Sequence, residues 1–150
     1  MDKAYLLEQL TEKLQGVETK ALAFAVEARE EARTGAPRAV NLAAATRARL
    51  EAAQQEVLAL EAFRPTDVPR GGRIGLGAVV ELEDGTAGKT VFLAPAGAGA
   101  ELTGPGGDGF LQVVTPGSPL GSALLGKRVG DVVETLVRGE LTEWEIVFAV

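Results

Sequence analysis

Apolar positions along the chain follow two different patterns, one in each half. In the first half, apolar or small residues recur at alternating steps of three and four, which is the spacing of an a/d seam on a helix. The first seam consists of Leu7, Leu10, Leu14, Val17, Ala21, Phe24 and Ala28. The second seam consists of Ala43, Thr46, Leu50, Ala53, Val57 and Leu60. In the second half, apolar and polar residues alternate over short runs, which is typical of β-strands. We therefore predict two long helices followed by a sheet.

A short turn separates the two seams. Gly35 is placed to end the first helix in a left-handed conformation, and Pro37 suits the first position of the second helix. Two helices of similar length joined by so short a turn pack antiparallel. Each covers about 30 residues, so at about 1.5 Å per residue the finger is about 40 Å long. The sequence thus predicts an antiparallel α-helical coiled-coil finger over residues 1–64.

Glycine and proline divide the finger from the second half. The segment 65–73 contains two glycines and two prolines, which is typical of a linker. A second domain is predicted over residues 74–150. We expect a glycine-rich loop over residues 97–109 and a short helix that Ser118 caps and Pro119 begins. The expected strands are residues 78–83, 89–94, 110–115, 131–138 and 142–150. This order predicts an α+β fold, an antiparallel sheet with a helix on one face.

Composition removes several classes of function. The chain has no cysteine and no histidine, which excludes disulfides, thiolate sites and the Ser-His-Asp triad. A net charge of -6 argues against unaided binding to nucleic acid. No apolar run approaches the roughly 20 residues that span a membrane, and the charged start does not resemble a signal peptide. The glycine-rich loop lacks the Lys-Ser/Thr of a phosphate loop. We expect a cytoplasmic protein.

Three segments of the second half form a recognisable series. Residues 74–80 are IGLGAVV, residues 113–127 are VVTPGSPLGSALLGK, and residues 144–147 are WEIV. In order and spacing these segments resemble the C-terminal domain of the GreA/GreB family of transcript-cleavage factors, including its Ser-Pro-hydrophobic-x-x-x-Leu-Leu-Gly-Lys motif. The resemblance implies an FKBP-like fold for this domain. It also implies an N-terminal antiparallel coiled coil, which agrees with the two seams.

By this resemblance the partner is RNA polymerase. The family's C-terminal domain docks on the rim of the polymerase secondary channel, and the Ser-Pro loop is part of that contact. Ser118, Pro119 and Leu120 are therefore implied to touch polymerase. A purely structural role is the alternative, in which Ser118 caps the helix, Pro119 begins it and Leu120 packs beneath it. The two roles are compatible.

The finger tip departs from the family. A family tip typically reads Gly-Asp-Leu-x-Glu-Asn-Ala-Glu-Tyr, and its first Asp and first Glu help to hold a second Mg²⁺ in the polymerase active site. Aligned on Gly35, this chain has Ala36 and Ala39 at those positions, and no carboxylate lies between residues 32 and 50. An alanine methyl cannot bind Mg²⁺. The tip residues are Arg33, Gly35, Ala36, Pro37, Arg38, Ala39, Val40, Asn41 and Leu42. We predict no catalytic residue, metal or cofactor, and no stimulation of cleavage; the alternative is cleavage that uses Glu30 and Glu31.

The tip is basic instead. Arginines gather there without neighbouring acids, namely Arg29, Arg33, Arg38, Arg47 and Arg49. Guanidinium groups at a tip suit RNA phosphate, a nucleotide or the catalytic carboxylates of polymerase. The alternative is that they only solubilise an alanine-rich hairpin. Leu42 lies off the seam, and with Val40 it is expected to expose apolar surface at the tip, which suits a protein contact. The alternative is a tip that closes on itself.

The sequence therefore predicts a factor that binds polymerase and modulates transcription, with no catalytic site of its own. Whether transcription rises or falls stays open. One alternative is a peptidyl-prolyl isomerase, which needs a pocket lined by aromatic rings; we expect the available rings to lie mostly in an ordinary core. They are Phe92, Phe110, Trp144 and Phe148.

The other alternative is an interaction protein whose coiled coil pairs with another chain. We expect a monomer, because the hairpin already covers its own seam.

Overall fold

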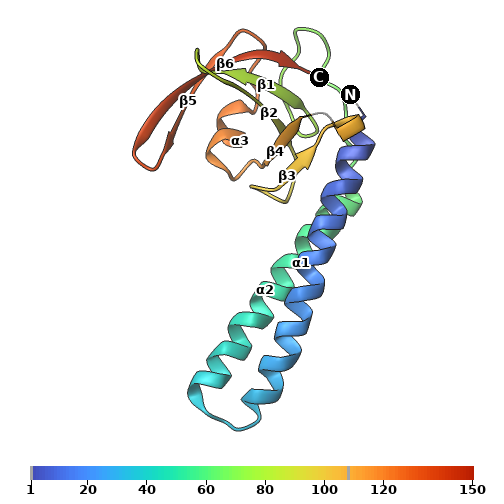
Figure 1. Ribbon diagram of the computed structural model, residues 1–150, viewed down its shortest axis with the longest axis vertical. Coiled ribbons are helices and arrows are strands. Elements are labelled where there is room, and N and C mark those ends of the chain that lie inside the picture. The colour runs from blue at the N-terminus through green and yellow to red at the C-terminus, as the bar shows by residue number, and fades with distance from the viewer. Residues whose placement is uncertain (1, 108) are drawn as a thin grey trace. The chain divides into compact units, whose positions relative to one another are not determined.

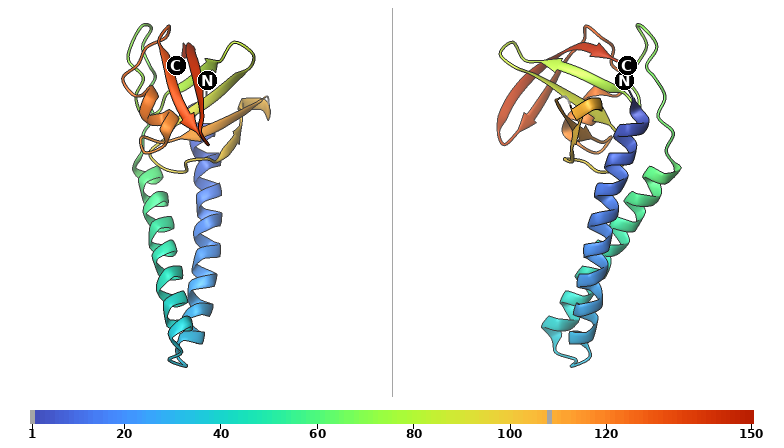
Figure 2. Two further views of the ribbon diagram at one scale, coloured as in Figure 1. Left: turned by 90° about the vertical axis from the view of Figure 1, so that its left-hand side faces the viewer. Right: turned by 45° about the vertical axis from the view of Figure 1, so that its right-hand side comes forward.

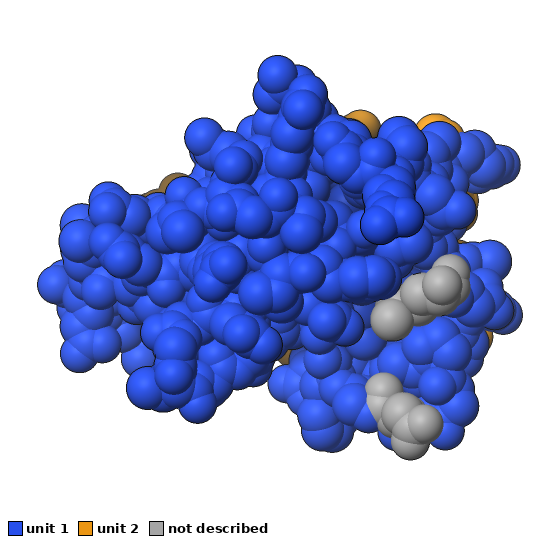
Figure 3. Space-filling model, turned by 90° about the horizontal axis from the view of Figure 1, so that it is seen from above, with its two compact units in different colours: residues 1–10, 63–150 blue, residues 11–62 orange. Residues whose placement is uncertain are grey.

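A computed structural model describes residues 2–107 and 109–150. The chain forms two compact units, residues 11–62 and residues 1–10 together with 63–150 (Figure 3). Along the chain, the elements are α1 (Lys3–Ala32), α2 (Pro37–Ala62), β1 (Val79–Glu83), β2 (Gly88–Leu93), β3 (Glu101–Thr103), a 3-10 turn (Pro105–Gly107), β4 (Phe110–Val114), α3 (Pro119–Leu124), β5 (Val132–Val137) and β6 (Glu140–Ala149). Among the described residues, no helix is both long and apolar enough to cross a membrane.

The helices α1 and α2 run antiparallel in the finger, as the sequence predicts (Figures 1 and 2). They contain 30 and 26 residues. Gly35 has a φ of 75° and its N–H donates to the carbonyl of Ala32, while α2 begins at Pro37. Only glycine adopts this left-handed conformation without steric cost, so the turn is fixed by its sequence.

The residues of the two predicted seams differ in how fully they are buried. All six residues of the second seam are buried or half-buried. In the first seam, Val17 is 54% exposed and Phe24 is 64% exposed. The other five residues of the first seam are buried or half-buried. From residue 11 to the end of α1, the buried and half-buried positions are Thr11, Leu14, Glu18, Ala21, Ala25, Ala28 and Ala32. Their steps also alternate three and four, so the contact follows a heptad pattern, with Glu18 and Ala25 in place of Val17 and Phe24.

The second unit contains a six-stranded sheet in the order β3-β4-β2-β1-β6-β5. The α+β fold is thereby confirmed. The prediction of an antiparallel sheet holds for the other pairings, but β2 and β4 are parallel. A parallel pair needs a long crossover, and residues 94–109 provide one. This stretch also contains β3, where the sequence predicts only a loop.

One face of the sheet carries the main core. The helix α3 lies on this face (Figure 1), and its Leu120 and Leu124 are buried there. The core consists of Ile74, Ala78, Val80, Leu82, Val91, Leu93, Val114, Leu120, Leu124, Val133 and Ile146. Val79 and Phe92 pair with each other across β1 and β2, and both are fully buried. They do not belong to this core cluster, although their neighbours in each strand do. They therefore point to the opposite face.

The first turns of α1 belong to the sheet unit. Leu6 and Leu10 are fully buried, and a Cβ at Gly97 would lie 2.8 Å from Leu10 Cδ1. The Gln9 side chain pairs with the backbone of Thr103 in β3: Thr103 N–H donates to Gln9 Oε1 at 2.8 Å, and Gln9 Nε2 donates to the Thr103 carbonyl at 3.1 Å. Gln9 thus supplies the two hydrogen bonds that a neighbouring strand would otherwise make.

Lys3 ties the start of α1 to two distant segments of the same unit. Its ammonium group donates to the carbonyl oxygens of Thr66 and Val150, each at 2.9 Å, and lies 3.3 Å from Asp67 Oδ1. The side chain is only 6% exposed, so these partners offset the cost of burying its charge. The compact unit therefore includes residues that the sequence assigns to the finger. The division into separable domains at 1–64, 65–73 and 74–150 stays a prediction.

Asp84 holds the turn between β1 and β2. Its Oδ1 accepts hydrogen bonds from Ala87 N at 2.8 Å and from Thr86 N and Oγ1, each at 2.9 Å. The bond from the Ala87 backbone, followed by those from Thr86, holds the pKa of Asp84 below its usual 3.8. When the pKa of an acid is lower in the folded state than in the unfolded state, its negative charge stabilises the fold fully at pH values above the unfolded-state pKa. This stabilisation is lost as the pH falls through the folded-state pKa.

We therefore predict that Asp84→Asn lowers the free energy of unfolding above pH 3.8, and that the difference from the parent narrows at lower pH. Urea denaturation of both proteins at several pH values measures this difference. A difference that stays constant down to about pH 2.5 would show that the charge of Asp84 has no part in the turn.

Candidate functional site at the finger tip and the Ser118 loop

The finger tip is built by the turn between α1 and α2. Arg33, Thr34 and Gly35 donate backbone hydrogen bonds to the last carbonyls of α1. Thr34 Oγ1 donates to the Glu31 carbonyl at 3.0 Å and accepts from Ala36 N at 3.4 Å. The tip is therefore ordered by its own backbone and one hydroxyl.

The first turn of α2 lacks the acids that would stabilise it. Ala36 precedes the helix, and its carbonyl accepts the first helical bond from Val40 N at 3.0 Å, so Ala36 occupies the N-cap and Ala39 the N3 position. Asp at the N-cap and Glu at N3 would satisfy free N–H groups and interact well with the helix dipole. The first turn contains no acidic residue. Helix stability therefore does not explain why alanines stand at these two positions.

The arginines of the tip are exposed, and most have no ion pair in the described part of the chain. The exception is Arg33, whose Nη1 lies 3.3 Å from Glu30 Oε2. Both side chains of this pair are more than half exposed, so it stabilises the helix only weakly. Glu31 is exposed as well. Within residues 2–107 and 109–150, no group of three or more His, Cys, Asp or Glu side chains is placed to hold a metal ion.

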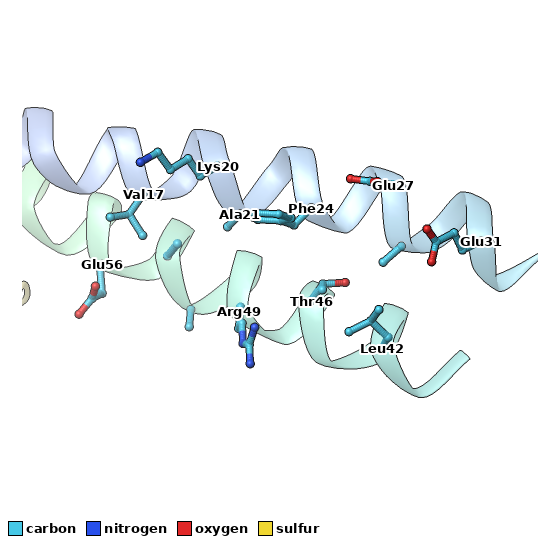
Figure 4. Close-up of a pocket in the computed structure, with 13 residues that line it drawn as sticks. Val17, Lys20, Ala21, Phe24, Glu27, Glu31, Leu42, Thr46, Arg49 and Glu56 are labelled. Atoms are coloured by element: carbon cyan, nitrogen blue, oxygen red, sulfur yellow. The ribbon is translucent and has the colours of Figure 1, made fainter. Parts of the chain in front are cut away.

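Two apolar grooves run along the finger, one on each side. The first, here named the Phe24 groove, has a volume of about 830 Å³ (Figure 4). It is lined by Val17, Lys20, Ala21, Phe24, Glu27, Ala28, Glu31, Leu42, Thr46, Arg49, Ala52, Ala53 and Glu56. The second, here named the Arg29 groove, has a volume of about 610 Å³, and its only charged residues are Arg29 and Arg47. Val40 lines the Arg29 groove and Leu42 lines the Phe24 groove; the predicted exposure of both is confirmed, at 45% and 49%.

The Ser118 loop is the second candidate surface. Ser118 caps α3, as predicted: its Oγ accepts from Gly121 N at 3.3 Å and from Thr115 N at 3.0 Å, and donates to the Thr115 carbonyl at 2.8 Å. Pro119 is exposed, whereas Leu120 is only 7% exposed. Of the three residues predicted to touch polymerase, Pro119 therefore offers surface, and Ser118 and Leu120 hold the loop in place. Leu125, directly after α3, is 36% exposed.

Removing the cap should loosen this loop. We predict that Ser118→Ala lowers the free energy of unfolding by about 1–2 kcal/mol, because the first turn of α3 and the N–H of Thr115 lose their acceptor. Chemical denaturation measures the loss. Ser122→Ala on the exposed side of the same helix is the control and should cost less than about 0.5 kcal/mol. Equal losses in the two variants would contradict the role of Ser118.

The four aromatic rings considered for an isomerase pocket differ widely in burial in the described part of the chain. Phe92 is fully buried, as expected for a core residue, and half-buried Trp144 has Lys89 Nζ 4.8 Å from its ring centroid. Burial lowers the pKa of Lys89. The core expectation is wrong for Phe110 and Phe148, which are 69% and 45% exposed. Their strands are separated by β2 and β1, so the rings rise from positions about 14 Å apart across the sheet. This arrangement gives no support to an isomerase site.

Comparison with known proteins decides the family. The family model described as "Transcription elongation factor, GreA/GreB, C-term" matches residues 69–149, more than half of the chain. The chain belongs to the GreA/GreB family. Its matched region contains the Ser118 loop, and the finger lies outside it.

The GreA/GreB relatives include transcription elongation factor GreA of Polaromonas naphthalenivorans (strain CJ2), which is 31% identical over 99 residues. That match spans 66% of this chain and 59% of the relative. Among solved structures, Gfh1 of Thermus aquaticus is 28% identical, with 95% of this chain and 92% of that chain covered and a TM-score of 0.44. GreA factor homolog 1 of Thermus thermophilus is 25% identical, with 97% and 93% covered and a TM-score of 0.41.

Proposed function

We propose that this chain binds RNA polymerase at the secondary channel and modulates transcription without stimulating transcript cleavage. Membership of the GreA/GreB family supports polymerase as the partner. The observation that carries the second part is the tip, where Ala36 and Ala39 stand at the N-cap and N3 positions and no carboxylate lies between residues 32 and 50. A second catalytic Mg²⁺ needs anionic oxygens to hold it and its water. In this proposal one chain acts on one polymerase in the cytoplasm and has no catalytic site of its own.

The Ser118 loop is proposed to contact the rim of the channel. Pro119 supplies exposed apolar surface, while Ser118 and buried Leu120 fix the loop that presents it. The finger then reaches inward, where exposed Arg38, Arg47 and Arg49 meet RNA phosphate, the incoming nucleotide or catalytic carboxylates of the polymerase. Charge-assisted bonds of guanidinium to such groups are among the stronger polar contacts in proteins.

A transcript-cleavage assay on backtracked polymerase tests the proposal. Alone, the chain should leave the rate of cleavage at the intrinsic rate of the polymerase. Added to an authentic cleavage factor, it should suppress the stimulated rate as its concentration rises, since both occupy one channel. Absence of suppression would mean that the chain does not occupy the channel.

Stimulated cleavage by the chain alone would favour the alternative that Glu30 and Glu31 replace the missing acids. Glu30 is already paired with Arg33 in the structure, which speaks against it. If the chain alone does stimulate cleavage, Glu30→Gln and Glu31→Gln should each be tested, and the substitution that abolishes the stimulation would identify the carboxylate that replaces the missing acids.

A further inference from the structure

The Phe24 groove leaves large apolar side chains uncovered in the middle of the finger. Val17 is 54% exposed, Phe24 is 64% exposed and Leu42 is 49% exposed. Phe24 is the most exposed large apolar residue among residues 11–62. Contiguous exposed apolar surface with a charged rim usually marks a contact with another molecule. The sequence predicts a monomer on the ground that the hairpin covers its own seam, but Val17 and Phe24 of that seam are exposed.

The charges on the α1 side of this groove are arranged unevenly about Phe24. Lys20 lies one turn before Phe24, whereas Glu27 and Glu31 lie one and two turns after it, all lining the same groove. In a parallel pairing of two copies, like charges would meet. In an antiparallel pairing with a two-fold axis beside Phe24, residue 24 meets residue 24 and residue 20 meets residue 28. Lys20 of one copy then lies beside Glu27 of the second copy, twice in the pair.

We propose that two copies of this chain associate through their Phe24 grooves as an antiparallel, two-fold dimer of fingers. The two Phe24 rings pack at the axis, and Val17 and Leu42 are covered at the flanks. Because the contact is the same patch on both copies, it closes after two subunits and does not extend into a fibre. The apolar centre supplies affinity, and the Lys20–Glu27 pairs select the antiparallel orientation.

The second groove does not offer the same contact. Its only charges are Arg29 and Arg47, so two Arg29 grooves brought together would place four like charges around one apolar patch. The Phe24 groove carries charges of both signs, Lys20 and Arg49 with Glu27, Glu31 and Glu56, whereas the Arg29 groove carries arginines alone, so charge favours the Phe24 groove for self-association. The dimer covers the side of the finger, so a chain in the dimer is not free to enter a channel as a single finger. Self-association and the proposed polymerase contact thus compete, but the dimer itself does not depend on polymerase.

Sedimentation equilibrium of the full chain tests the proposal. The parent should show a concentration-dependent equilibrium between monomer and dimer. Phe24→Glu should raise the dissociation constant at least about a hundredfold, because each dimer loses two buried rings and gains two buried charges. Leu22→Glu is the matched control, since Leu22 is 49% exposed and lines the Arg29 groove. It should change the dissociation constant by less than about threefold.

A charge exchange tests the orientation. Lys20→Glu alone should raise the dissociation constant about tenfold, and adding Glu27→Lys should return it to near the parent value, because the pair is reversed on both copies. Lys13→Glu, at an exposed position of α1 outside the groove, is the control for net charge. Circular dichroism checks that each variant keeps its helices. A parent that stays monomeric at about 1 mM, equal effects of Phe24→Glu and Leu22→Glu, or failure of the double exchange to restore association would each overturn the proposal.

Discussion

A chain with Ala36→Asp and Ala39→Glu is expected to stimulate transcript cleavage at least about tenfold above the parent on backtracked RNA polymerase. Both positions lie at the finger tip, at the N-cap and N3 of α2. Two carboxylates there provide the hard oxygen ligands that a second Mg²⁺ requires. A tenfold gain corresponds to about 1.4 kcal/mol of transition-state stabilisation, which is modest for a metal ion. Gel analysis of shortened transcripts over time measures the rate.

The same two substitutions should not harm the fold. Asp at the N-cap accepts a backbone N–H of the first turn, Glu at N3 reaches back, and both favour the positive end of the helix dipole. Thermal unfolding should therefore show equal or higher stability than the parent. Ala45→Asp with Ala48→Glu is the matched control, because it adds the same charges at the same spacing on an exposed part of α2. If the control stimulates cleavage as much as the tip variant, the gain comes from net charge, and the assignment of the tip positions is wrong.

Gly121→Ala is expected to lower the free energy of unfolding by about 3 kcal/mol, at the upper end of the range for overpacking a closed site. Gly121 is buried in the first turn of α3, and a Cβ there would collide with the carbonyl group of Thr115 and lie 2.8 Å from Ser118 Oγ. Backbone atoms cannot move aside as the end of a flexible side chain does. The methyl group would also push apart the hydrogen bonds that fix the Ser118 loop. Chemical denaturation measures the loss, and binding of the variant to polymerase should weaken with it.

Gly117→Ala is the control for this prediction. Gly117 lies in the same loop, is exposed, and would place its Cβ in open space. We expect a change of less than about 0.5 kcal/mol. Similar losses in the two variants would mean that the collision at Gly121 is relieved by movement of the loop, and that the loop is not held as tightly as its hydrogen bonds imply.

Local signals in the sequence predicted the fold well wherever neighbouring residues determine the structure. Gly35 and Pro37 mark the turn of the finger because one adopts a positive φ and the other suits the start of a helix. Ser118 marks the start of α3 for the same kind of reason. In contrast, β3 contains only three residues and is held by β4 and by Gln9, which is 94 residues away in the chain from Thr103. Its short, glycine-flanked sequence carries no sign of those partners.

The chemistry of the candidate site could be predicted from the sequence, but the side chains that it exposes could be predicted only in part. The absence of tip acids and the exposure of Val40 and Leu42 follow from the sequence. The exposure of Val17 and Phe24 was not predicted, because a heptad pattern in α1 passes through Glu18 and Ala25 as well as through Val17 and Phe24, and the larger apolar residues were the wrong choice. The buried row is marked in the sequence by Ala21, Ala25, Ala28 and Ala32, so the small residues were the signal that would have found the groove.

The hydrogen bonds of Gln9 have a bearing on how this protein avoids aggregation. A strand at the border of a sheet offers free N–H and C=O groups to any extended chain that comes near. At β3 the backbone of Thr103 is occupied by one side chain of α1, so an incoming strand finds no ready partner at that residue. This protection exists only while the first turns of α1 are docked. A nascent or partly unfolded chain would expose this edge of the sheet until Gln9 bonds to Thr103, so docking of α1 protects the folded protein against pairing with another chain.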